Sequence, residues 1–71
     1  MKLKELLAVT NARHIQVTTP DHEKYFSLDN GQTFRKNLFK PEDNLTDILH
    51  NMTVNYFAPV REDFIEVVVK E

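Results

Sequence analysis

Two short stretches of the chain repeat apolar residues at the spacing of an α-helix. The first predicts an amphipathic helix over residues 2–9, with charged residues between leucines at i, i+3 and i+4: Leu3, Leu6 and Leu7. The second predicts a helix within residues 42–50, where Pro41 suits the first turn and either Asp43 or Asn44 can cap the start. Its apolar stripe has the same spacing and consists of Leu45, Ile48 and Leu49. Each predicted helix therefore has one side to bury.

Polar and apolar residues alternate in residues 14–19, which are also rich in β-branched side chains. This period of two predicts a strand with Ile15 and Val17 facing the core. Pro20 and Asp21 then favour a turn that ends the strand.

An Asn-Gly pair between strand-forming residues predicts a β-hairpin over residues 25–35. A three-residue loop, residues 29–31, pairs Phe26 with Phe34 and puts both rings on one face, whereas a two-residue loop pairs Phe26 with Arg35. We therefore expect the three-residue loop. Gly31 then takes the left-handed conformation that such a loop needs.

The C-terminal part of the chain predicts a second β-hairpin, with strands at residues 53–59 and 64–70. A loop centred on Arg61 and Glu62 creates one continuous apolar face, because it opposes Ala58 with Ile65, Tyr56 with Val67, and Val54 with Val69.

On the other face of this hairpin the same loop opposes Pro59 with Phe64, Phe57 with Glu66, and Asn55 with Val68. That second face is more apolar than contact with water alone would favour. Pro59 also indicates a sheet edge, since proline has no N–H to donate.

Together these elements predict one domain, residues 1–71, of the α+β class. Their order is helix, strand, strand, strand, helix, strand, strand, and we expect a mostly antiparallel sheet of four or five strands. The sequence has no internal repeat, low-complexity segment or glycine–serine linker that would divide it.

The composition narrows the classes of function. The chain has 71 residues and no cysteine, which excludes disulfides, thiolate metal sites and thiol nucleophiles. Its net charge of −2 disfavours a dedicated nucleic-acid-binding protein, which usually carries a basic surplus. The sequence pattern matches neither a signal peptide nor a membrane span, so we expect a cytoplasmic protein without a membrane partner.

The sequence shows no catalytic constellation, and we expect neither enzyme activity nor a cofactor. It lacks a Gly-rich phosphate loop and the G-x-S-x-G and H-E-x-x-H patterns. Asp43, Asp47 and His50 share one stripe of the second predicted helix and are the nearest approach to a metal site. The helix dipole favours the same arrangement without a metal, so we expect a solvated helix face there. For His14 and His22 we expect surface positions.

Protein binding is the function that the second face of the C-terminal hairpin favours. Leaving its apolar side chains in water forfeits burial that a small domain needs, and two short helices cannot easily cover both faces of a sheet. One helix on each face is the alternative explanation. We expect a protein partner, or a second copy of the chain in a homodimer, bound through four apolar anchors: Phe57, Pro59, Phe64 and Val68.

Weak nucleic-acid binding is the alternative function. Arg35, Lys36 and Lys40 are close in sequence, with Phe34 and Phe39 interleaved. Cations and aromatic rings in such a pattern grip single strands through phosphate contacts and base stacking. Three cations are few, and Phe34 has a predicted role in the core, so we expect nucleic acid to be the less favoured partner.

The two ends of the chain resemble known small proteins. Residues 1–7 (MKLKELL), the strand after them, and residues 64–69 (FIEVVV) look like the helix-plus-sheet proteins of bacterial prophages and conjugative elements. Members of that group generally have no assigned activity, so the resemblance carries over no functional residue. It implies an accessory protein that acts by binding.

Overall fold

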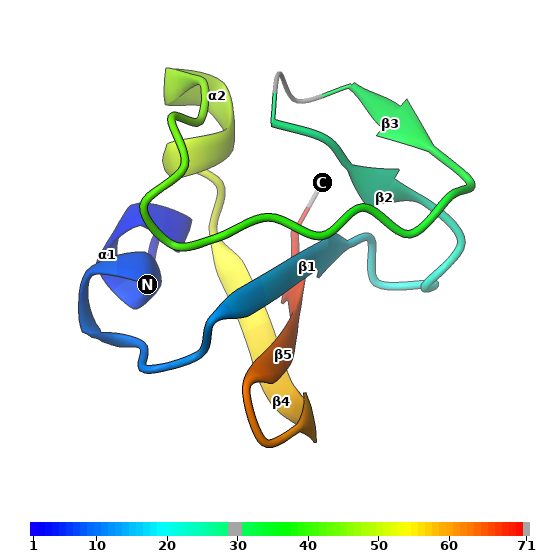
Figure 1. Ribbon diagram of the computed structural model, residues 1–71. Helices are drawn as coiled ribbons and strands as arrows, with labels where there is room; N and C mark the ends of the chain where they lie inside the picture. Colours follow the sequence, from blue (N-terminus) through cyan, green and yellow to red (C-terminus); the bar gives the residue numbers. More distant parts are fainter. Residues whose placement is uncertain (29–30, 71) are drawn as a thin grey trace.

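The computed structural model of the chain describes residues 1–28 and 31–70. Within these residues it forms two helices and five strands: α1 (Leu3–Val9), β1 (His14–Thr18), β2 (Tyr25–Phe26), β3 (Gln32–Thr33), α2 (Asp47–His50), β4 (Val54–Arg61) and β5 (Phe64–Val69). The α+β class and the order of the elements are as predicted (Figure 1). Neither described helix is long and apolar enough to cross a membrane.

The strands form one five-stranded sheet with the order β3-β2-β1-β5-β4. Three of its four strand pairs are antiparallel, but the central pair of β1 and β5 is parallel, so the sheet is mixed. This parallel pair aligns Ile15 with Ile65 and Val17 with Val67. The apolar positions of both central strands therefore lie on the same face.

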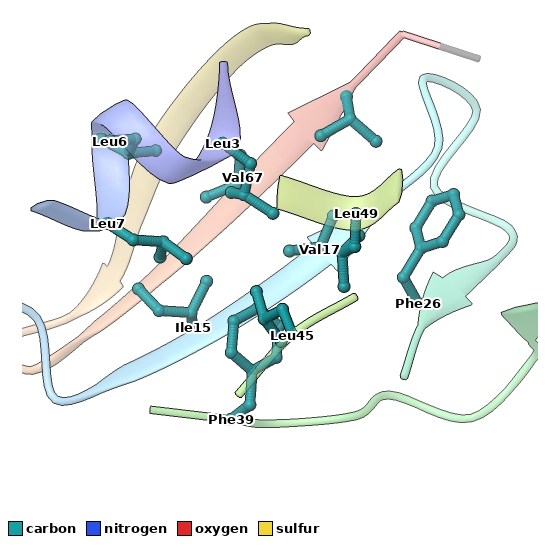
Figure 2. Close-up of a cluster of buried hydrophobic side chains, with 11 residues drawn as sticks. Leu3, Leu6, Leu7, Ile15, Val17, Phe26, Phe39, Leu45, Leu49 and Val67 are labelled. Carbon is teal, nitrogen blue, oxygen red and sulfur yellow. The ribbon is translucent and has the colours of Figure 1, made fainter. Parts of the chain in front are cut away.

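Both helices cover that one face of the sheet. Side chains from α1, α2 and the central strands meet there in a buried cluster (Figure 2), whose members are Leu3, Leu6, Leu7, Ile15, Val17, Phe26, Phe39, Leu45, Leu49, Val67 and Val69. Ile15 and Val17 are completely buried, which confirms their predicted place in the core. Because side chains alternate along a strand, Phe64, Glu66 and Val68 of β5 belong to the opposite face. The two helices are thus not divided between the faces, and we call the opposite side the helix-free face.

α2 is shorter than predicted. Thr46 caps it, since its side-chain oxygen accepts a hydrogen bond from the Leu49 N–H at 3.3 Å, so the prediction of a cap at Asp43 or Asn44 is wrong. Leu49 is completely buried, whereas Ile48 is 63% exposed. A helix of barely one turn presents only part of the predicted apolar stripe to the core.

The register of the first hairpin also differs from the prediction. β2 and β3 pair Phe26 with Gln32, so the expected pairing of Phe26 with Phe34 is wrong, and Phe34 is 78% exposed. Among the described residues the structure records a positive φ at His22 and at no glycine, so the left-handed conformation predicted for Gly31 is not observed. The other two residues of the predicted loop, residues 29 and 30, lie outside the described residues.

Phe39 occupies the core in place of Phe34. Its backbone forms a bridge to Ile15, with N–H···O distances of 2.7 and 3.0 Å in the two directions. Its ring joins the buried cluster. β1 therefore has a partner beside Ile15, at a position that the short strand β2 does not reach.

Candidate functional site

β4 is an edge strand whose outer side is largely open. A bridge between Lys2 and Thr53 covers the residues just before its start. In the described part of the chain no further segment pairs with this side, so residues 55–61 form a free edge, which we call the β4 edge. Pro59 lies within it, as its missing N–H predicts.

Three large apolar side chains of the β4 edge are about half exposed: Tyr56 (49%), Phe57 (48%) and Val60 (52%). In the ladder with β5, Tyr56 lies opposite Val68 and Phe57 lies opposite Val67. Opposed residues share a face, so Tyr56 points to the helix-free face and Phe57 to the face with the helices. The exposed apolar surface therefore flanks the edge on both faces.

The predicted register of this hairpin holds where Val54 opposes Val69 and is wrong beyond that pair. An irregularity between Val54 and Tyr56 shifts the pairing by one residue. Phe57 consequently does not oppose Glu66 as predicted. β5 is apolar on both faces apart from Glu66, so the alternation of its residues does not reveal such a shift.

The four predicted anchors are divided between the two faces. Phe57 and Pro59 lie on the face with the helices, and Phe64 and Val68 lie on the helix-free face. Val68 is completely buried, so it presents no surface to a partner. Phe57 and Pro59 are exposed, and Phe64 is partly buried.

A polar cluster on the helix-free face joins the β1–β2 turn to the C-terminal hairpin. Glu66 accepts a hydrogen bond from Gln16 Nε2 at 2.6 Å, and its other carboxylate oxygen lies 3.0 Å from His22 Nδ1. His22 Nε2 lies 3.0 Å from the hydroxyl of Tyr56. Both ring nitrogens of His22 thus have partners, and this Glu66 cluster holds Tyr56 in place beside the β4 edge.

His22 reaches the cluster from a strained position in the turn. Its φ of 61° lies in the left-handed region, which is unfavourable for a residue with a Cβ atom. The turn is held by hydrogen bonds from the His22 N–H to the Thr19 carbonyl at 2.9 Å and from the Glu23 N–H to Asp21 Oδ1 at 3.1 Å. The Thr19 hydroxyl also donates to Asp21 Oδ1. This bond contributes most to the lowered pKa of Asp21, and the bond from the Glu23 N–H lowers it further. The sequence indicates this turn, but the partners of His22 depend on a register that the sequence does not reveal.

Two cavities adjoin His14 at the start of β1. The larger has a volume of about 610 Å³ and is lined by Thr10, Ala12, Arg13, His14, Lys40, Pro41 and Glu42. The other has a volume of about 480 Å³ and is lined by His14, Leu38, Arg61, Glu62, Asp63 and Phe64. The Glu66 cluster contributes to neither of these cavities.

The cations of the predicted nucleic-acid site do not share either of these two cavities. Arg35, Lys36 and Lys40 are exposed, but of these three only Lys40 lines one of the two cavities. Phe34 is exposed, whereas Phe39 is buried and has no free ring face for a base.

The carboxylate–histidine stripe predicted on the second helix does not form. Asp43 lies before α2, where its carboxylate accepts a hydrogen bond from the Lys40 N–H at 2.8 Å, while Asp47 and His50 are the end residues of α2. Among the residues that the structure describes, no group of three or more histidines and carboxylates is placed to hold a metal ion.

Comparison of the chain with models of protein families, with curated proteins and with solved structures finds no match. The resemblance of the chain ends to proteins of prophages and conjugative elements therefore stays a prediction.

Proposed function

We propose that this chain is a small protein-interaction module that forms a homodimer by pairing its β4 edge with the β4 edge of a second copy. The observation that supports this is the position of Tyr56 and Phe57, which flank a free edge on opposite faces. A strand added at the edge contacts both side chains, whereas a partner docked on one face reaches only one of them. The open N–H and C=O groups of an edge strand supply main-chain hydrogen bonds to such a partner.

The unequal edges of the sheet favour a second copy as the occupant. β3, at the other edge, has only two residues, whereas β4 has eight. Pairing two β4 strands about a two-fold axis uses the long edge of both copies and leaves only the short β3 edges outside. Assembly then stops at two copies instead of continuing into a fibre.

The sequence of β4 is compatible with pairing to itself. Its one charged residue is Arg61, at the end of the strand. Antiparallel pairing places each Arg61 near the start of the other β4, so the two arginines lie far apart. Pro59 interrupts the ladder at one position, which limits the affinity and makes micromolar protein concentrations the range to test.

Sedimentation velocity over micromolar concentrations tests the proposal. The wild-type chain should sediment with the mass of a dimer, and Val60→Lys should sediment as a monomer, because lysine on an edge strand opposes further pairing. Val9→Lys makes the same change at the end of α1, where the side chain is 70% exposed, and should leave the dimer intact. A monomeric wild type, or equal effects of the two variants, would contradict the proposal.

In this proposal the chain acts in the cytoplasm by binding and catalyses no reaction. A domain of this size without cysteine needs no oxidising compartment for its folding. An accessory protein of a mobile element is one setting for such a module, as the resemblance of the chain ends implies.

A further inference from the structure

The larger cavity gathers cationic side chains from two segments that are far apart in the sequence. Arg13 and His14 lie at the start of β1, and Lys40 comes directly after Phe39, which forms the bridge to β1. Considering residues 1–28 and 31–70, neither Arg13 nor Lys40 forms an ion pair with a carboxylate. The volume of about 610 Å³ is typical of small-molecule sites. Two unpaired cations at such a cavity are available to a ligand with a negative charge.

Backbone hydrogen bonds fix the segments that carry these cations. The N–H groups of Arg13 and His14 both donate to the Asp63 carbonyl, each at 2.9 Å, which ties the entrance of β1 to the tip of the C-terminal hairpin. The Lys40 N–H donates to Asp43 Oδ2 at 2.8 Å, so the nearby carboxylate is held by the backbone of Lys40 and not by its ammonium group. A site formed before binding loses less entropy when the ligand arrives.

The other lining residues restrict the chemistry of the ligand. Glu42 is the one carboxylate among the described residues that line the cavity. With Arg13 and Lys40 it gives the lining a net charge of +1 when His14 is neutral. Glu42 repels a ligand that is anionic throughout, but a carboxylate accepts hydrogen bonds from sugar hydroxyls, as it does in dinucleotide sites. Ala12 and Pro41 add apolar surface for a ring.

We infer that this cavity is a binding site for a phosphorylated sugar, with the phosphate held by Arg13, His14 and Lys40 and a hydroxyl of the sugar held by Glu42. A nucleoside 5′-monophosphate carries both groups in one small molecule, and each unit of a single RNA strand carries them as well. Residues 55–61 do not line this cavity. The inference therefore goes beyond the proposed dimer and does not depend on it.

NMR titration of the ¹⁵N-labelled chain with adenosine 5′-monophosphate tests the inference. Saturable shifts should appear at the amides of residues 12–14 and 40–42. Inorganic phosphate should shift the same amides more weakly, and adenosine should leave them unchanged. A short single-stranded RNA that binds the same amides more tightly than the monophosphate would show that the phosphate belongs to a strand; weaker binding of the RNA would show that it belongs to a free nucleotide.

Charge-reversal variants distinguish binding of the ligand in the cavity from general electrostatic attraction to the protein surface. Arg13→Glu and Lys40→Glu should each weaken binding of adenosine 5′-monophosphate by about tenfold, since each removes a charge-assisted hydrogen bond. Arg35→Glu and Lys36→Glu change the net charge equally at exposed positions outside this cavity, and they should leave the affinity unchanged.

Three results would overturn the inference: no saturable shift at millimolar ligand, shifts confined to other amides, or equal weakening by the cavity variants and their controls. A dispersed amide spectrum shows that each variant keeps its fold. If Arg13→Glu does not fold, the comparison of Lys40→Glu with Lys36→Glu decides the question.

Discussion

Tyr56 and Phe57 are neighbours on β4 and lie on opposite faces of the sheet, each about half exposed. Side chains alternate along a strand, and the shift in register between Val54 and Tyr56 decides which face each side chain takes: Tyr56 lies on the helix-free face and Phe57 on the face with the helices. A strand paired at the β4 edge would cover part of both side chains at once. Substitutions of either side chain should therefore affect the same binding event.

We predict that Tyr56→Ser and Phe57→Ser each weaken self-association by about tenfold, since large aromatic residues commonly contribute this much at an interface. Sedimentation equilibrium measures the dissociation constant of each variant. Phe34→Ser is the matched control, because Phe34 is more exposed than either residue and lies away from the β4 edge. If only one of the two β4 variants responds, the partner docks on that face and edge pairing is wrong.

The Glu66 cluster should stabilise the fold as well as position Tyr56. Removing the imidazole in His22→Ala should lower the free energy of unfolding by about 1 kcal/mol, because its contacts with the Glu66 carboxylate and the Tyr56 hydroxyl are lost. His22→Gly loses the same contacts but relieves the strain of φ 61°. It should therefore be more stable than His22→Ala by about 1 kcal/mol. Urea unfolding compares the three proteins, and a His22→Gly variant less stable than His22→Ala would show that the strain is absent.

Adjacent residues of α2 should differ sharply in their contribution to stability. Leu49 is completely buried and Ile48 is largely exposed. Leu49→Ala should lower the free energy of unfolding by about 3 kcal/mol, because it leaves a cavity in the core, whereas Ile48→Ala should change it by less than about 0.5 kcal/mol. Thermal or urea unfolding followed by circular dichroism measures both. Equal losses would mean that α2 turns both side chains inward, as the sequence pattern alone predicts.

Local patterns in the sequence predict the elements of this fold well. The leucines of α1 and the alternation in β1 have a clear period, and each predicts residues of the buried apolar cluster. Gln16 and Thr18, on the other side of β1, are buried as well, which the alternation does not predict. The parallel pairing of β1 with β5 has no local signal in the sequence. No turn connects the two strands directly, because most of the chain lies between them. The sequence therefore predicts the class and order of elements, while the mixed character of the sheet comes from long-range packing.

Registers and the candidate sites are harder to predict for a related physical reason. Phe34 and Phe39 are equally apolar, and packing against Ile15 selects Phe39 for the core. The cavity that joins Arg13 to Lys40 exists because of that same bridge. Arg13 and Lys40 come together only because Phe39 packs in the core. The sequence pattern does not show this packing, so it groups Lys40 with Arg35 and Lys36, its neighbours along the chain.

Asp21 links the stability of the β1–β2 turn to pH. The Thr19 hydroxyl, the Glu23 N–H and the nearby charge of Lys24 favour its carboxylate and lower its pKa. A group whose pKa is lower in the folded state contributes stability above its unfolded pKa and loses it as the pH falls through the folded value. Wild type should therefore exceed Asp21→Asn in stability at neutral pH, and the difference should shrink as the pH falls below about 4.

Urea unfolding at a series of pH values measures this difference. Thr19→Val keeps the shape of a buried side chain and removes the hydroxyl that contributes most to the lowered pKa of Asp21. When Asp21→Asn is introduced into the Thr19→Val protein, the resulting loss of stability should depend less on pH than the loss that Asp21→Asn causes in the wild type. The same pH dependence in both proteins would show that the Thr19 hydroxyl does not favour the carboxylate of Asp21.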